Sequence, residues 1–240
     1  MGKWKGAWFL VKSELLRARW KSIIPIVFAG YMLLFMVPLF ENALNGNDSS
    51  FAYWAIDLYA LLLFPCLGLM VTQPYFYWRT DTYTKKLEVW RTLPIPFKQI
   101  VLGKFLLYLT ISIPAMILFF TGFYFAVHAM NPQFELGAFL QFALFWIVYT
   151  TIAGFGYLYV ELGYKGKIYF WYCLILSFAA LGGLIAVFAW TKESILLNSY
   201  LTVLNGGWWL PLAAIAVAAA GIPLGLGSIE KKLRKRNLAK

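Results

Sequence analysis

Long apolar segments alternate with short polar ones along the whole chain. Six of them are long enough to cross a bilayer, which takes roughly 20 helical residues. They are residues 22–41, 53–78, 105–127, 137–160, 168–190 and 208–229. Backbone N–H and C=O groups in a bilayer must be paired internally, and the alternating pattern of a barrel strand is absent. The pattern therefore predicts an all-α polytopic membrane protein with six transmembrane helices.

The composition agrees with this fold class. Hydrophobic residues make up 62% of the 240 residues and charged residues 13%, whereas about a quarter of a soluble domain is charged. The six segments leave no room for a separate soluble domain, so we expect residues 1–240 to form a single transmembrane domain. Its predicted parts are an interfacial helix at 1–21, six spans at 22–229 and a basic tail at 230–240.

The basic residues predict how the chain is oriented. Of the 21 Lys and Arg residues, only Lys192 lies on one side of the predicted spans, and all others lie on the side of the two termini. Loops rich in Lys and Arg face the cytoplasm, so we expect a multi-pass protein of the cell membrane with both termini cytoplasmic. The net charge of +11 then reflects topology. Nucleic acid is not an expected partner, because these charges are not gathered on a soluble face.

The N-terminal segment 1–21 has the pattern of a helix that lies on the membrane. One helical face carries Trp4, Ala7, Trp8, Val11, Leu15 and Ala18, with Lys5, Lys12 and Arg19 in a stripe beside it. Amphipathic helices with Trp and basic residues lie at the interface. A second apolar strip consists of Phe9, Leu16 and Trp20. This strip suits either contact with a partner protein or simple interfacial placement.

The loop between the second and third spans contains a further predicted helix, residues 80–93. Thr80, Asp81 or Thr82 would cap its start. Pro94 and Pro96 would end it, because the residue before a proline disfavours helix. The side chains expected to face the cytoplasm and dock a partner are Lys85, Lys86, Leu87, Glu88, Trp90 and Arg91. The sequence thus predicts a short rigid helix close to the membrane, with Trp90 as its anchor and Val89 as a further apolar contact.

Three other features concern the spans and the external side. Residues 193–205 are apolar but too short to cross, which suits a re-entrant helix or an ordinary interfacial loop. Asp57 lies about one turn into the second span, and we expect a hydrated interfacial carboxylate there rather than an ion-coupling site. Glu161 has Lys165 four residues later, so we expect a surface ion pair between them.

Catalytic patterns are absent from the sequence. There is one His, and no HExxH, Gly-x-Ser-x-Gly or Walker motif. We therefore expect no catalytic residue, no cofactor-binding residue and no metal ligand on this chain. Any energy for work would come from another subunit.

The stretch LEVWRTLPIPFKQIVLGK, together with six spans and an amphipathic N-terminal helix, resembles an ABC-2 type transporter permease. The resemblance is to the small bacterial six-span type with a separate ATPase subunit. It implies that 4–21 form the elbow helix, 80–93 the coupling helix that meets the ATPase, and 193–205 the external re-entrant element. The implied partners are two copies of an ABC ATPase, which binds ATP and Mg²⁺, a second identical or related permease, and membrane lipids.

This resemblance implies the permease subunit of an ABC transporter, which exports an amphiphilic, lipid-like, peptide or drug-like cargo by ATP hydrolysis on the partner. The alternative is a membrane-embedded binding or regulatory scaffold without ATPase coupling. Such a scaffold would need no coupling helix, and it would tolerate mutation of 80–93. A membrane enzyme is the least favoured class, because the spans carry few polar groups.

Overall fold

Helices carry the described part of the chain back and forth between two ends of the molecule. The computed structural model describes residues 3–45, 50–71, 87, 89–90 and 95–235. Within these residues there is no strand, and six helical stretches are long and apolar enough to cross a membrane. The predicted all-α membrane fold and its number of spans are confirmed.

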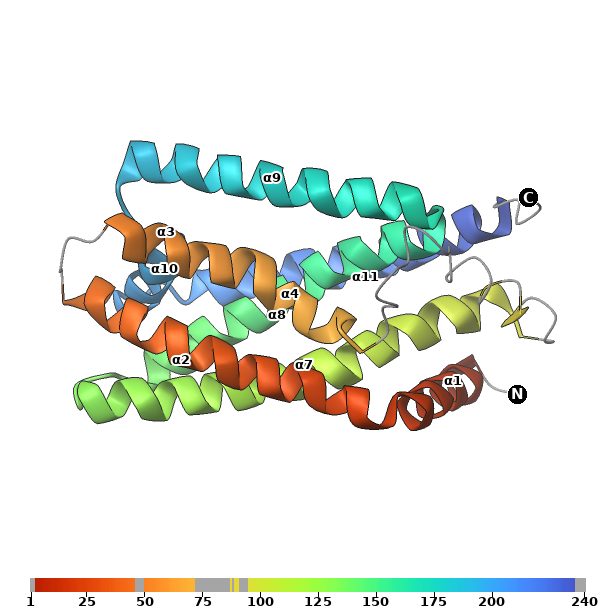
Figure 1. The fold of residues 1–240 in the computed structure, drawn as a ribbon, viewed down its shortest axis with the longest axis horizontal. Helices are drawn as coiled ribbons and strands as arrows, with labels where there is room; N and C mark the ends of the chain where they lie inside the picture. The colour runs from red at the N-terminus through yellow and green to blue at the C-terminus, as the bar shows by residue number, and fades with distance from the viewer. Residues whose placement is uncertain (1–2, 46–49, 72–86, 88, 91–94, 236–240) are drawn as a thin grey trace.

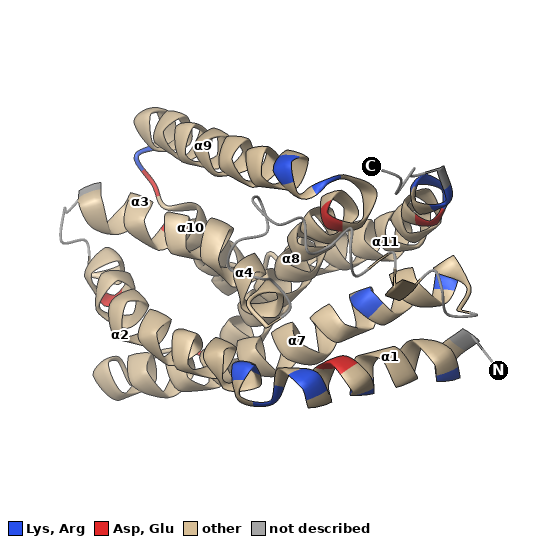
Figure 2. Cartoon of the chain, turned by 45° about the vertical axis from the view of Figure 1, so that its right-hand side comes forward, with Lys and Arg blue, Asp and Glu red and all other residues tan. Residues whose placement is uncertain are grey.

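The described helices follow one another along the chain. They are α1 (Lys3–Ala18), η1 (Arg19–Ile23), α2 (Ile24–Leu44), α3 (Ser50–Leu58), η2 (Tyr59–Leu63), α4 (Phe64–Leu69), α7 (Phe97–Met130), α8 (Leu136–Gly163), α9 (Gly166–Thr191), α10 (Ile195–Leu204) and α11 (Trp209–Lys235). The long helices lie side by side, with both termini at one end and α10 at the other (Figure 1). We name the end with the termini the basic end, because Lys and Arg gather there (Figure 2), and the other the opposite end.

Helix boundaries follow proline and turn residues, and one of them differs from the prediction. Pro96 is extended (φ −60°, ψ 139°) and α7 begins at the next residue, so this helix starts eight residues before the predicted span at 105. Lys98 and Lys104 therefore lie in a helix and not in a loop. At the opposite end, α9 stops at Lys192, whose backbone is left-handed (φ 55°).

Aromatic rings fill the core of the opposite half. Neighbouring ring centroids lie between 4.8 and 6.5 Å apart, mostly edge to face, the arrangement that ring quadrupoles favour. The buried rings are Phe40, Phe64, Phe119, Phe120, Phe123, Phe134, Phe139, Phe142, Trp146 and Tyr200. They come from α2, α4, α7, α8, α10 and the connection before α8, so one cluster holds these segments together.

The Tyr108 side chain lies in the middle of the bundle, between Gly68 of α4 and Gly154 of α8. Its ring is buried between α4 and α8, and its hydroxyl donates to the backbone carbonyl of Thr150 at 2.8 Å. A Cβ atom on Gly68 or on Gly154 would overlap the Tyr108 ring. The two glycines therefore provide the space that this large side chain needs.

Helices α9 and α11 contribute little to the core. Only 6% of the most apolar stretch of each is buried, and both carry large exposed side chains such as Trp171 and Leu224. Apolar surface of this extent would be costly in water. Its exposure agrees with a chain that lies in a bilayer.

We expect Gly154→Ala to destabilise the protein by about 1–3 kcal/mol, because the added methyl group overpacks the Tyr108 ring. Gly156→Ala is the matched control, since the nearest atom to its Cβ, the Tyr172 hydroxyl oxygen, is 4.0 Å away. Both changes bring the same gain in helix propensity. Thermal unfolding of the detergent-solubilised protein should show a lower midpoint for Gly154→Ala alone; equal midpoints would contradict this packing.

Candidate functional site

Five elements meet in one buried cluster at the basic end. This basic-end cluster consists of Leu10, Leu87, Trp90, Ile100, Val101, Leu162, Ile229 and Leu233. Its members come from α1, the segment 87–90, α7, α8 and α11. A displacement of the segment 87–90 would therefore act directly on four helices, because packed interiors transmit displacement with little compression.

A buried ion pair lies beside this cluster and joins α7 to α8. The Lys104 ammonium is 2.9 Å from Glu161 Oε1, and the two side chains are 4% and 0% exposed. The Lys104 ammonium also lies 5.9 Å from the centre of the Trp90 ring, within the range of a cation–π contact. The predicted surface pair of Glu161 with Lys165 is therefore wrong. The ionic partner comes from 57 residues earlier, a pairing that helical spacing cannot reveal.

The second oxygen of Glu161 is also buried. Its Oε2 atom has no hydrogen-bond partner among the described residues. Lys104 is therefore the cation that compensates this carboxylate, and separating the two would leave an uncompensated charge in an apolar environment.

Glycine allows the N-terminal helix to lie against α7 at the same level. A Cβ atom on Gly103 would come within 3.2 Å of the Ala7 carbonyl oxygen and of the Leu10 side chain. Ala7, Leu10 and Val11 are buried in this contact. The neighbouring residues Gly103 and Lys104 thus have two roles, since the first admits α1 and the second binds α8.

The structure divides the predicted face of the N-terminal helix between buried and exposed positions. Val11 is buried and Leu15 half-buried, but Trp4 and Trp8 are exposed together with the second apolar strip. The buried face is turned toward Leu10, because α1 packs on α7 rather than standing alone. Arg19 is exposed and begins the 3₁₀ turn η1 that leads into α2, with a positive φ of 39°.

The end of α11 is held against α8 by a lysine between two tyrosines. The Lys232 ammonium lies 3.6 Å from the centre of the Tyr164 ring and 4.7 Å from that of Tyr159, and it donates to the Tyr159 hydroxyl at 3.3 Å. A Cβ on Gly163 would come within 3.0 Å of the Lys232 chain. These contacts place the end of α11 at the basic-end cluster.

Four of the six predicted docking residues, Lys85, Lys86, Glu88 and Arg91, lie outside the described residues. The other two, Leu87 and Trp90, belong to the basic-end cluster and are 4% and 9% exposed. The structure therefore places the Trp90 ring inside its own chain, whereas we expected it to face the cytoplasm.

Val89 is the exposed apolar residue between them, at 61%. The apolar contacts of this segment are thus divided between two sides, with Leu87 and Trp90 directed inward and Val89 outward.

The opposite end contains a second buried charge, which caps a helix. Ser194 Oγ donates to Asp57 Oδ1 at 2.7 Å, and the backbone N–H groups of Ile195 and Leu196 donate to its two carboxylate oxygens at 2.8 Å each. Ser194 in turn accepts from Leu197 N–H at 3.2 Å. Asp57 is only 4% exposed, so the predicted hydrated carboxylate is wrong. A carboxylate at a helix N-terminus accepts hydrogen bonds from N–H groups that have no partner within the helix. Its negative charge also interacts favourably with the positive end of the helix dipole.

The predicted external element 193–205 is a helix, α10, packed on the bundle. Its inner side contributes Leu196, Tyr200 and Val203 to the aromatic core, and Ser199 accepts a hydrogen bond from Trp146 Nε1 at 3.1 Å. The cap and the inner side together fix α10 over the opposite end of α8.

Neither end has the composition of a metal centre. No group of three or more His, Cys, Asp or Glu side chains comes together in the part of the chain that the structure describes. The buried charges pair with lysine or with helix N–H groups. These buried charges therefore connect one helix to another.

The comparison with known families decides the class of the protein. The model of a family described as ABC-2 family transporter protein matches residues 10–162, more than half of the chain. The chain belongs to the ABC-2 transporter family. No curated protein and no solved structure matches it. ABC-2 membrane proteins are generally non-catalytic and generally work with an ATPase subunit. The matched residues include the entire Trp90–Lys104–Glu161 arrangement of this permease.

We expect Lys104→Ala or Glu161→Ala to destabilise the permease by about 3–5 kcal/mol, since each leaves one buried charge without its partner. The double replacement Lys104→Met with Glu161→Leu should recover most of this loss, because it removes both charges at similar volume. Thermal unfolding in detergent gives the comparison. The partly exposed pair Glu230–Arg234, with an N–O distance of 2.8 Å, is the control, and its Ala variants should change stability by about 0.5 kcal/mol or less. Equal effects at the two pairs would contradict the burial of the first.

We expect Asp57→Ala to loosen α10, since the change removes acceptors from three buried donors and costs about 1–3 kcal/mol. Hydrogen–deuterium exchange of a peptide covering residues 195–204 should become faster. Asp57→Asn should show a smaller increase, because its amide oxygen can still accept. Glu193→Ala, an exposed acid next to the same cap, is the control and should leave exchange unchanged; unaltered exchange in Asp57→Ala would exclude the cap.

Proposed function

We propose that this chain is the permease subunit of an ABC exporter with an amphiphilic, lipid-like, peptide or drug-like cargo. ATP and Mg²⁺ bind a separate nucleotide-binding subunit, present in two copies. The observation that carries the proposal is the basic-end cluster, which ties the segment 87–90 to four helices. A permease driven from outside needs such a connection between its docking surface and its spans.

The basic end is the cytoplasmic side in this proposal. All Lys and Arg residues except Lys192 belong to segments at or near this end in the predicted topology, and the described ones are seen there in Figure 2. Positively charged segments remain in the cytoplasm during insertion. An ATPase in the cytoplasm would then meet the segment 80–93 directly.

The side chains at 87–90 face two opposite sides, and this suggests how a displacement by the ATPase is transmitted. Val89 faces outward, and we propose that it docks the ATPase together with Lys85, Lys86, Glu88 and Arg91. Leu87 and Trp90 face inward and pass the displacement to the cluster.

From the cluster, the displacement reaches the ion pair. Trp90 lies over Lys104, which holds Glu161. A displacement of the segment 87–90 would therefore move α7 and α8 together. Since buried interfaces switch between discrete arrangements, closure of the ATPase pair would change the tilt of both helices together.

A second permease, identical or related, completes the proposed transporter. Six packed helices leave little room for a pathway within one chain. Helices α9 and α11 expose large apolar surfaces that a second permease would cover. Closed two-fold assemblies are the commonest arrangement of soluble oligomers, and we propose the same arrangement here. The amphiphilic cargo agrees with the aromatic content of 20%.

The test separates docking from transmission in the complete complex. Val89→Asp should weaken association with the ATPase by about tenfold or more, because it places a charge in an apolar contact. Lys165→Asp, an exposed site at the same end, is the control and should keep association. Trp90→Ala should retain the ATPase but export less cargo for each ATP hydrolysed. The readouts are co-purification, ATPase rate and transport in vesicles.

Two outcomes would reject the proposal. Full association and full coupling in both variants would show that the segment has no coupling role. Wild-type chain that co-purifies with no ATPase would favour the scaffold function, for which mutation of this segment is harmless.

A further inference from the structure

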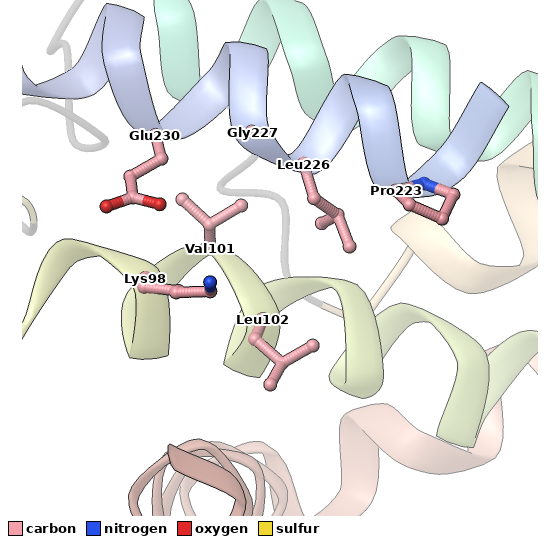
Figure 3. A pocket seen from close by; sticks show the side chains of 7 residues that line it. All are labelled: Lys98, Val101, Leu102, Pro223, Leu226, Gly227 and Glu230. Atoms are coloured by element: carbon pink, nitrogen blue, oxygen red, sulfur yellow. The ribbon is translucent and has the colours of Figure 1, made fainter. Parts of the chain in front are cut away.

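A hollow of about 260 Å³ lies between α7 and α11 near the basic end. Its lining residues are Lys98, Val101, Leu102, Pro223, Leu226, Gly227 and Glu230. Figure 3 shows Val101 of α7 and Leu226 of α11 directed toward the opposite helix, with Lys98 and Glu230 at the same end. Five of the seven residues are apolar, and the two charged ones lie together.

One end of the hollow is charged and the other is apolar, as in one leaflet of a bilayer, where polar headgroups border an apolar interior. Lys98 is in the first turn of α7 and Glu230 in the last two turns of α11, so the charged end of the hollow lies toward the ends of these two helices at the basic end. Pro223 lies two helical turns deeper, about 10 Å along α11. The apolar end thus points toward the middle of a hydrocarbon layer whose half-thickness is about 15 Å.

The charged end carries both signs. Within the described part of the chain, Lys98 has no ion-pair partner, while Glu230 Oε1 accepts from Arg234 Nη2 at 2.8 Å. Lys98 and Arg234 are exposed, and Glu230 is half-buried. A ligand with an anionic group and, beside it, a cationic group matches this end, whereas a purely anionic headgroup would meet the Glu230 carboxylate.

Gly227 creates the space between the two helices. A Cβ at this position would have no atom within 4 Å, and the same is true of Gly221 on the same helix. Leu226 and Leu102 form apolar walls on either side. A longer side chain at position 227 would therefore extend into open space.

From these observations we propose that the hollow binds a phospholipid with a primary amine headgroup. One acyl chain lies along Leu102, Leu226 and Pro223. The phosphate meets the Lys98 ammonium, and the ammonium of the headgroup donates to Glu230. The site requires neither ATP hydrolysis nor transport, so it stands or falls independently of the exporter proposal.

The experiment uses purified full-length chain in phosphatidylcholine vesicles. The vesicles carry a trace of either photoactivatable phosphatidylethanolamine or photoactivatable phosphatidylglycerol, each with the reactive group on an acyl chain. After irradiation, peptide mass spectrometry measures labelling of residues 97–102 and 223–230. We expect the ethanolamine probe to label both segments about tenfold more than the glycerol probe, since only the ethanolamine headgroup brings a cation of its own to the Glu230 carboxylate, whose Oε1 accepts from Arg234.

Paired variants locate the site. Gly227→Leu should reduce labelling about tenfold by filling the space, and Gly221→Leu should leave it unchanged. Glu230→Lys should reverse the preference toward the glycerol probe, while Glu193→Lys, the same charge change at the opposite end, should not. Should Gly227→Leu fail to fold, the reversal in Glu230→Lys decides alone. Equal labelling by the two probes in wild type, undiminished labelling in a folded Gly227→Leu, or no reversal in Glu230→Lys would each overturn the proposal.

Discussion

The pairing of Lys104 with Glu161 is the interaction on which the basic end depends. Two opposite charges in an apolar environment tolerate little displacement, because their attraction must offset the loss of water around both. The pair therefore sets the relative height of α7 and α8. Gly103, one residue earlier, then lies against α1, and the Lys104 ammonium lies over the Trp90 ring. Three separate contacts follow from one pairing, which places the N-terminal helix and the segment 87–90 in register with the spans.

The local part of this structure could be predicted from the sequence. Apolar length predicted the six spans, helical periodicity predicted the N-terminal helix, and a short apolar segment indicated the re-entrant helix or loop where α10 lies. These signals work because a bilayer forces each span to satisfy its own backbone. The start of α7 was missed, since Lys98 and Lys104 were taken as loop residues. A helix can extend beyond the hydrocarbon layer, and hydropathy does not report that extension.

The site could be predicted only in outline. Asp57 was predicted to be a hydrated carboxylate and Glu161 to pair with Lys165 at the surface, but both carboxylates are buried. Their partners lie 57 and 137 or more residues away, where neither periodicity nor spacing gives information. Trp90 was predicted to anchor a partner subunit, but the side that its ring faces depends on how the segment packs on Leu10, Leu162 and Leu233. Such packing is tertiary information.

The cap of α10 by Asp57 also bears on the order in which the chain assembles. Asp57 is in the second span, whereas its donors are the Ser194 hydroxyl and the N–H groups of Ile195 and Leu196, more than half the chain length later. During synthesis the carboxylate enters the membrane well before these donors exist. Until they arrive it carries the cost of an ionisable group in an apolar layer. Completion of the fifth span and α10 removes that cost, so the early spans gain their final stability only when most of the chain has been made.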